Sequence, residues 1–195
     1  MIPVTRDKDE WAIVLEYLPH GHSSHGRPEP IAQVVGEKFF SLLEVVPREG
    51  AVFSLGDRVY IGDGPRDNVK YIKRALRFQE LTSSASQELE EVVKDIVREA
   101  EERFVEFFNK AEPLTTRMHS LELLPGIGKK HMWEILNARK EKQFVSYEDI
   151  KARCTTVPEP RKMMEARIMK ELRGEDPRHA LFVHVHTGEH REERR

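Results

Sequence analysis

The residues with the clearest capacity for chemistry form one short stretch, Leu-Leu-Pro-Gly-Ile-Gly-Lys-Lys-His, at positions 123–131. Pro125 sets φ for the second position of a type II turn, and Gly126 tolerates the positive φ of the third. Gly128 removes a side chain where the next helix begins, so the free backbone N–H groups there are open to close approach. Ile127 is expected to point inward and hold the turn between two helices.

An anion is the ligand that such a turn would bind, because free N–H groups and the positive end of a helix dipole attract phosphate. Three side chains would add charge around it: Lys129, Lys130 and His131. Two known phosphate loops do not fit. A nucleotide-binding P-loop needs four residues between its glycines, and a dinucleotide fingerprint needs glycine where His131 stands. We predict neither ATP nor NAD binding, and a turn that only packs helices stays open as the alternative.

Charge is distributed unevenly along the 195 residues, although the formal net charge is only −2. Residues 83–114 carry 4 lysines and arginines against 9 aspartates and glutamates, whereas residues 115–173 carry 13 against 8. The only positive segment therefore contains the glycine turn, where a basic footprint for a polyanion would be needed.

Five β-like runs lie in residues 1–82, with glycine and proline in the gaps between them. The runs are Trp11–Leu18, Ile31–Val35, Phe39–Val46, Arg58–Ile61 and Tyr71–Phe78. This spacing predicts a small antiparallel β-barrel or sandwich as the first domain.

One long amphipathic helix is predicted over residues 83–114. Ser84 and Gln87 are spaced as a capping box, apolar residues follow at three- and four-residue steps, and Pro113 marks the end. The polar face of this helix is acidic. We interpret it as the solvated surface of a connecting helix, since no histidine joins the carboxylates to suggest a metal site.

Two helix pairs are predicted in residues 115–173. A shift of 33 residues lays Val157-Pro158 on Leu124-Pro125 and Ile168-Met169 on Ile135-Leu136, which indicates an internal duplication. Two copies are too few for a solenoid, so we predict a compact four-helix unit. The expected helices after the glycine turn are Lys129–Lys142, Ser146–Arg153 and Arg161–Leu172.

The last segment, residues 174–195, contains a β-like run at Ala180–His186 and ends in a charged tail. An isolated strand is not stable, so this run could return to the N-terminal sheet.

The segment Ser120–Leu136 resembles the helix-hairpin-helix motif of DNA- and RNA-binding proteins. The positions on the family pattern are Leu121, Leu124, Pro125, Gly126, Ile127, Gly128, Ile135 and Leu136. The resemblance implies that the hairpin's N–H groups hold a phosphate without reading bases, and that a monovalent cation sometimes assists. The second copy has Glu159, Pro160 and Arg161 in place of the glycine turn. We expect that copy to be a structural partner and not a second phosphate site.

The order of the whole chain also resembles an archaeal family of unknown function that is predicted to bind RNA. In that family the N-terminal part looks like an OB-type barrel. The resemblance implies an α+β fold with an OB-like domain over residues 1–82 and a connecting helix over 83–114. A tandem helix-hairpin-helix domain over 115–173 and a C-terminal strand and tail over 174–195 would follow.

Two groups of three histidines raise the alternative of a metal site: His20, His22 and His25, and His184, His186 and His190. No carboxylate or cysteine completes a recognised ligand set, so we predict no metal. The first group is more simply a polar loop, or part of the ligand face at His20–Arg27 if the domain is an OB-type barrel. The single cysteine, Cys154, cannot form an internal disulfide and is expected in the core.

We therefore expect a non-catalytic cytoplasmic protein that binds nucleic acid, RNA in preference to DNA, through Pro125–His131. The charged N-terminus lacks the apolar segment of a signal peptide, and no membrane partner is predicted. Trp133 could stack on a base, and further basic residues could widen the face: Arg139, Lys140, Lys142, Lys151, Arg153, Arg161 and Lys162.

Two alternatives from other classes stay open. In the first, the protein is an interaction or scaffold module whose hairpins only pack helices. In the second, it is a metal-dependent nuclease or phosphodiesterase that uses the two histidine groups.

Overall fold

The computed structural model describes residues 8–22 and 29–184, and the chain divides into two compact units. The first unit comprises Met1–Val92, Leu172–Glu175 and Ala180–Arg195, and the second comprises Val93–Glu171 and Asp176–His179. The boundary falls inside helix α1 (Ser83–Glu99), which contributes residues to both units. The result is a mixed α+β protein, as the sequence predicts.

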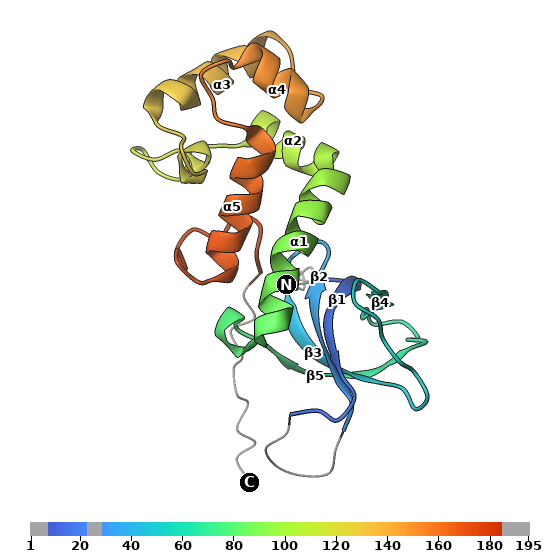
Figure 1. The fold of residues 1–195 in the computed structure, drawn as a ribbon. Coiled ribbons are helices and arrows are strands. Elements are labelled where there is room, and N and C mark those ends of the chain that lie inside the picture. The colour runs from blue at the N-terminus through green and yellow to red at the C-terminus, as the bar shows by residue number, and fades with distance from the viewer. Residues whose placement is uncertain (1–7, 23–28, 185–195) are drawn as a thin grey trace, which may run out of the picture. The chain divides into compact units, whose positions relative to one another are not determined.

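The first unit contains a five-stranded antiparallel sheet that curls into a half-barrel (Figure 1). Its strands are β1 (Trp11–Leu18), β2 (Ile31–Gly36), β3 (Leu42–Pro47), β4 (Arg58–Tyr60) and β5 (Val69–Ala75), in the order β4-β1-β2-β3-β5. Irregular register in the β1–β2 and β3–β5 pairs accompanies the bend of these strands. All five strands of the predicted barrel or sandwich are present, and among the described residues β4 and β5 do not pair, so the sheet is open along these two edges.

The sheet buries β2 and β3 completely, whereas β5 is largely exposed. One face of the sheet carries a compact apolar cluster: Ala12, Val14, Ala32, Val34, Leu43, Val45, Phe53, Val59, Ile61 and Val69. The alternation of positions 12 and 14, 32 and 34, and 43 and 45 is the period of two that places successive side chains on opposite faces.

The turn between β2 and β3 is organised by Asp9. Its carboxylate accepts hydrogen bonds from the backbone N–H groups of Lys38 at 2.7 Å, Phe39 at 2.8 Å and Ser41 at 3.2 Å. Phe40 has a φ of 55°, a left-handed conformation that is uncommon for a residue with a side chain. The predicted strand from Phe39 therefore starts later, at Leu42, because Asp9 holds the preceding residues in a turn.

Helix α1 begins one residue before the predicted capping box. The hydroxyl of Thr82 accepts a hydrogen bond from the backbone N–H of Ala85 at 3.0 Å and also donates to Glu16 on β1. The backbone N–H of Thr82 donates to the Gln33 side chain on β2 at 3.0 Å. The predicted Ser84 cap is thus wrong. Thr82 caps the helix instead and also hydrogen-bonds to side chains of β1 and β2. A short 3₁₀ helix, Phe78–Glu80, takes the place of the predicted end of β5.

The predicted long helix is interrupted at Ala100, which separates α1 from α2 (Glu101–Lys110). In a continuous helix the N–H of residue 101 would bond to the carbonyl of Val97. That carbonyl instead accepts a hydrogen bond from the Tyr147 hydroxyl at 3.1 Å, and the Glu101 carboxylate accepts the backbone N–H of Tyr147 at 2.6 Å. A side chain inserted into the helical ladder is a known cause of such breaks.

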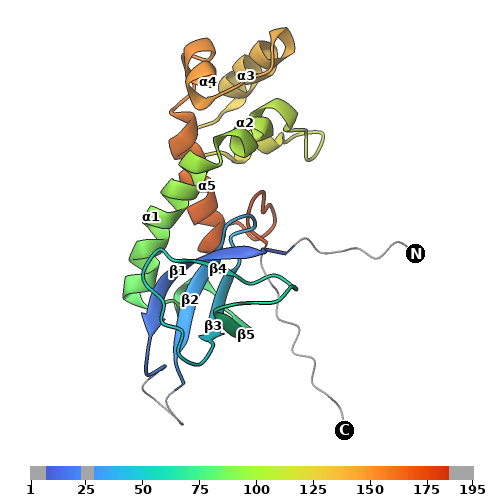
Figure 2. The same ribbon diagram turned by 90° about the vertical axis from the view of Figure 1, so that its right-hand side faces the viewer.

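The rest of the second unit consists of a short 3₁₀ helix, η2 (Ser120–Leu123), and three α-helices (Figure 2). The helices are α3 (Lys129–Glu141), α4 (Tyr147–Arg153) and α5 (Pro160–Leu172), within one residue of the predicted bounds. No helix among the described residues combines the length and the apolarity that a membrane crossing requires.

The predicted C-terminal strand is absent from its described part, residues 180–184. These residues nevertheless belong to the first unit, where Phe182 and Val183 are buried. The backbone N–H of His184 donates to the carbonyl of Phe39 at 3.0 Å, and the two rings stack with centroids 4.2 Å apart. The other predicted strand residues, 185 and 186, and the tail lie outside the described residues.

Candidate functional site

The glycine turn, residues 124–128, has the predicted type II geometry and is called the first turn below. The N–H of Ile127 donates to the carbonyl of Leu124 at 3.1 Å, and Gly126 has a φ of 82°. Ile127 is buried, whereas Pro125, Gly126 and Gly128 are exposed. The first turn therefore exposes much of its backbone to solvent and is anchored to the unit by two buried apolar side chains, Leu124 and Ile127.

The N-terminus of α3 directly follows the first turn and is not capped by a side chain. The first helical hydrogen bond runs from the N–H of Met132 to the carbonyl of Gly128 at 2.9 Å. The N–H groups of residues 129 to 131 therefore lack an acceptor within the helix. Together with the helix dipole they form a positive, open surface of the kind that binds an oxyanion.

The three predicted charged side chains at this surface have different roles. Lys129 is held by the Glu122 carboxylate at 2.8 Å and by the carbonyl of Arg117 at 3.1 Å. The hydrogen bond from Lys129, with a backbone hydrogen bond from His119, keeps the pKa of Glu122 below its usual value. His131 bonds through Nδ1 to the carbonyl of Gly126 at 2.8 Å. Lys130 is exposed and has no ion pair among the described residues, so it is the cation that is free to meet a ligand.

The two glycines of the first turn have different reasons to be glycine. At Gly126 the positive φ is unfavourable for other residues, and a Cβ would lie 3.1 Å from Cγ of Pro158 in the second copy. Gly128 has an extended φ of −106°, and a Cβ there would meet no atom within 4 Å. Packing within the described protein thus explains Gly126 but not Gly128, whose bare backbone is consistent with a ligand that approaches closely.

This difference leads to a stability prediction for the two glycines. We expect Gly126→Ala to lower the free energy of unfolding by about 1–2 kcal/mol, because alanine is strained at positive φ. Gly128→Ala is the matched control and should change it by less than about 0.5 kcal/mol, because the cost of alanine at the N-cap of α3 is offset by the lower conformational entropy of the unfolded chain. Urea denaturation followed by circular dichroism measures both values, and equal losses at the two sites would contradict the assignment.

The internal duplication is visible as a pair of reciprocal contacts. Glu134 of α3 accepts hydrogen bonds from the backbone N–H, at 3.3 Å, and from the hydroxyl of Thr156, just before the second turn (residues 157–161). Arg167 of α5, 33 positions after Glu134, donates to the carbonyl of Leu123 at 3.2 Å, just before the first turn. Leu123 and Thr156 are also 33 positions apart. Each copy therefore anchors the turn of the other, which agrees with the predicted duplication.

Known proteins resemble this protein over nearly the whole length of its chain. A family described as "Protein of unknown function (DUF655)" matches residues 8–184. The chain belongs to the DUF655 family. The uncharacterized protein MJ0038 of Methanocaldococcus jannaschii is 42% identical over 178 residues, which span 91% of this chain and 80% of that protein.

A solved DUF655 structure is also similar, the crystal structure of Af1531 from Archaeoglobus fulgidus. It has a TM-score of 0.80 and 46% identity and covers 90% of this chain and 100% of that one. The predicted resemblance to an uncharacterised archaeal family is confirmed. The resemblance of residues 120–136 to a nucleic-acid-binding motif stays a prediction.

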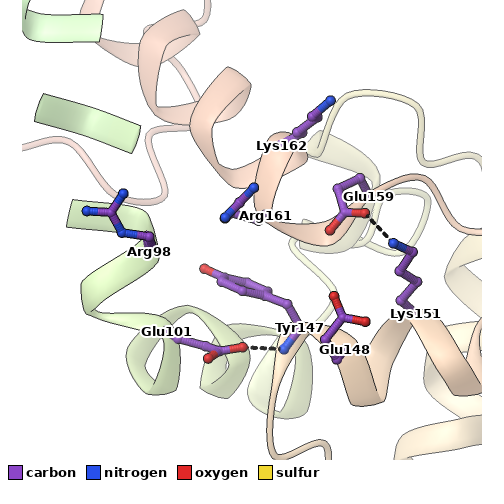
Figure 3. A pocket seen from close by; sticks show the side chains of 8 residues that line it. All are labelled: Arg98, Glu101, Tyr147, Glu148, Lys151, Glu159, Arg161 and Lys162. Atoms are coloured by element: carbon purple, nitrogen blue, oxygen red, sulfur yellow. Dashed lines mark hydrogen bonds and ion pairs between the residues drawn. The ribbon is translucent and has the colours of Figure 1, made fainter. Parts of the chain in front are cut away.

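The second turn of this DUF655 protein lies beside a pocket of about 380 Å³ that is lined by both acidic and basic side chains (Figure 3). Its charged lining residues are Arg98, Glu101, Glu148, Lys151, Glu159, Arg161 and Lys162. Glu159 is paired with Lys151 at 3.0 Å, and helix α5 begins at Pro160, which has no N–H to offer. A carboxylate and a proline at the helix N-terminus make the second turn a poor anion site, and its structural role stays a prediction.

Most of the residues that were predicted to widen the basic face form hydrogen bonds or ion pairs within the protein. Arg139 donates to the carbonyl of Phe108 at 2.9 Å, and Arg153 pairs with Asp149 at 3.3 Å. Arg161 lies 3.5 Å from Glu165. Lys140, Lys142 and Lys162 are exposed without an ion pair in the described part of the chain. The basic face is therefore narrower than the sequence suggests.

The histidine groups do not assemble into a metal site within the residues that the structure describes. His22 pairs with the buried Glu44 at 2.7 Å, and His184 stacks on Phe39. His25, His186 and His190 lie outside the described residues. Cys154 is buried as predicted, and burial raises the pKa of its thiol to about 11, so it is a packing residue.

Two residues that position the DUF655 fold were not identified from the sequence, Arg167 and Asp9. Arg167 could have been found, because the 33-residue shift aligns it with Glu134 and suggests a matching role. Asp9 gives no local signal, since it acts on residues about 30 positions away.

Proposed function

We propose that this DUF655 protein is a non-catalytic nucleic-acid-binding protein, RNA in preference to DNA, that holds the phosphate backbone at the first turn. The observation that carries the proposal is the set of free N–H groups at the start of α3, beside the open backbone of Gly128 and the unpaired Lys130. In this view η2, the first turn and α3 act as a helix-hairpin-helix motif. The second copy supports the first turn through Pro158 and Arg167.

The contacts made by such a turn predict how the protein binds. Backbone N–H groups position a phosphate but do not read bases, so affinity should depend little on sequence. The half-barrel, as an OB-like domain, would supply a second surface. Because Lys129 is already paired with Glu122, Lys130 carries most of the side-chain attraction, and affinity should fall steeply with salt.

The test is fluorescence anisotropy with labelled RNA and DNA over a range of salt concentrations. We expect Lys130→Glu to weaken binding at least about tenfold, since it places a carboxylate beside the phosphate and costs about 1.4 kcal/mol or more. Lys162→Glu is the matched control. It changes the net charge equally in the second copy and should change affinity by about twofold or less.

Two results would oppose the proposal. The absence of binding to any nucleic acid at low salt would remove it altogether. An equal loss for Lys130→Glu and Lys162→Glu would show that attraction is spread over the surface and that the first turn is not the site.

The alternative of a protein-interaction module has its own supporting observation. Val52 and Leu55, on the loop between β3 and β4, expose most of their apolar side chains. In this case neither Lys130→Glu nor Lys162→Glu would change the affinity for nucleic acid, whereas Leu55→Asp would abolish binding of the protein partner.

A further inference from the structure

The exposed side of α3 carries four residues that form a continuous strip: Lys130, Trp133, Asn137 and Lys140. They follow one another at three- and four-residue steps and therefore lie on one face of the helix. The strip is about 15 Å long at the rise of an α-helix. None of the four side chains makes an ion pair or ring contact within the described residues, and none is acidic. We call it the α3 strip.

Trp133 is the unusual member of the α3 strip, because 55% of it is exposed. A helical side chain leans toward the N-terminus of its helix and covers the preceding turn. We therefore expect the indole to lean toward Lys130 and the free N–H groups at the start of α3.

The charges around the strip favour a polyanion over an apolar partner. Lys130 and Lys140 flank Trp133 on both sides along the helix axis. Of the two carboxylates on α3, Glu134 is hydrogen-bonded to Thr156 while its charge also acts on Lys130, and Glu141 is the last helical residue. An aromatic ring between two free lysines is the arrangement that single strands use, with bases on the ring and phosphates on the cations.

We infer that the α3 strip binds an unpaired strand of nucleic acid, with one base stacked on Trp133 and its phosphates at the first turn and Lys140. A duplex cannot use the ring in this way, because the faces of its bases are already stacked on one another. The inference rests on the proposed function and sharpens it, since it selects single-stranded or unpaired segments as the substrate class. RNA and DNA share this chemistry, and the experiment compares them.

The experiment uses the full chain with Trp11→Phe, which leaves Trp133 as its only tryptophan. Its fluorescence is titrated with a short unstructured RNA, the equivalent DNA, the same DNA lacking bases, and a duplex. We expect quenching by both unpaired strands, but not by the abasic strand or the duplex. Greater affinity for the RNA strand than for the DNA strand would identify RNA as the preferred ligand.

Affinities of variants with Trp11 intact give an independent measurement. Trp133→Ala should weaken binding of the unpaired strand about 5- to 150-fold, as expected for the loss of one stacked base. Trp133→Phe, the matched control, should retain most of the affinity because it keeps an aromatic face. Trp133→Ala should leave the duplex affinity unchanged, and its circular dichroism should match that of the wild type.

The outcomes separate this inference from the function on which it rests. If Lys130→Glu weakens binding but Trp133→Ala does not, the first turn is a phosphate site and the stacking inference is overturned. Quenching by the abasic strand as strong as by the normal strand also overturns it. If no nucleic acid binds, both the inference and the proposed function fail.

Discussion

Replacing Arg167 by methionine should lower the free energy of unfolding by about 3–5 kcal/mol, the typical effect of breaking a buried ion pair. Arg167 is 1% exposed and is fully engaged. Its guanidinium donates to Glu171 at 2.7 Å, to Asp176 at 3.1 Å, to the carbonyl of Leu123 at 3.2 Å and to the carbonyl of His179. Methionine would remove the guanidinium that lies 2.7 Å from the buried Glu171 carboxylate, and the carboxylate would keep its cost of burial without that charge.

The measurement is urea denaturation followed by circular dichroism. Arg98→Met is the control, because Arg98 is exposed and its pair with Asp95 should contribute less than about 1 kcal/mol. The double variant Arg167→Met with Glu171→Leu should recover part of the loss, since it removes both buried charges. A loss of no more than about 1 kcal/mol for Arg167→Met alone would mean that the cluster does not hold the unit together.

The Arg167 cluster should also weaken in acid. Burial acts to raise the pKa of Asp176, but hydrogen bonds from Arg167 and His179 outweigh it and hold the pKa below the usual value. A carboxylate with a lowered pKa in the folded state contributes stability above its unfolded pKa, and this contribution is lost as the pH falls through the folded pKa. The effect of Arg167→Met should therefore shrink at strongly acidic pH.

Replacing Asp9 by alanine should lower the free energy of unfolding by about 3 kcal/mol or more. The side chain accepts three backbone N–H groups in the turn between β2 and β3, and two of these bonds are buried. Each buried donor that loses its acceptor costs about 1–3 kcal/mol. The left-handed φ of Phe40 would also lose the contacts that maintain it.

Asp9→Asn provides the graded control, because asparagine keeps one acceptor oxygen and should lose less than alanine. Gly36 offers a second check, since a Cβ there would lie 2.0 Å from Cγ of Asp9. Gly36→Ala should be strongly destabilising alone but nearly neutral when Asp9 is already alanine. Tryptophan fluorescence in a Trp133→Phe background reports on the first unit through Trp11. Additive effects of the two substitutions would contradict the proposed contact.

The elements of this fold were predictable to the extent that local signals define them. Alternation and turn formers located five strands, and helical periodicity located α3, α4 and α5 within one residue. The first turn was predictable in detail, because proline and glycine restrict their own φ values. The 33-residue repeat likewise predicts two copies, and the contacts Glu134–Thr156 and Arg167–Leu123 are related by the same shift.

The errors come from specific side-chain contacts, most of them between residues distant in the sequence. The long helix breaks at Ala100 because the Tyr147 hydroxyl, 50 residues beyond Val97, takes that residue's carbonyl. Strand β3 starts late because Asp9 holds the turn before it. Lys129 appears in the sequence as a free cation and is instead paired with Glu122. Periodicity and composition carry no record of these bonds.

The sequence alone thus determined the five strands, helices α3 to α5 and the turn at residues 124–128. These depend on the φ preferences of proline and glycine and on the period of apolar residues, which are local. Only the tertiary structure decided that Gly126 is needed for packing while Gly128 is not, and that Lys130 is left free while Lys129 is not. It also showed that 55% of Trp133 is exposed. These distinctions depend on which groups meet across the folded chain, because burial and pairing are properties of the assembled structure.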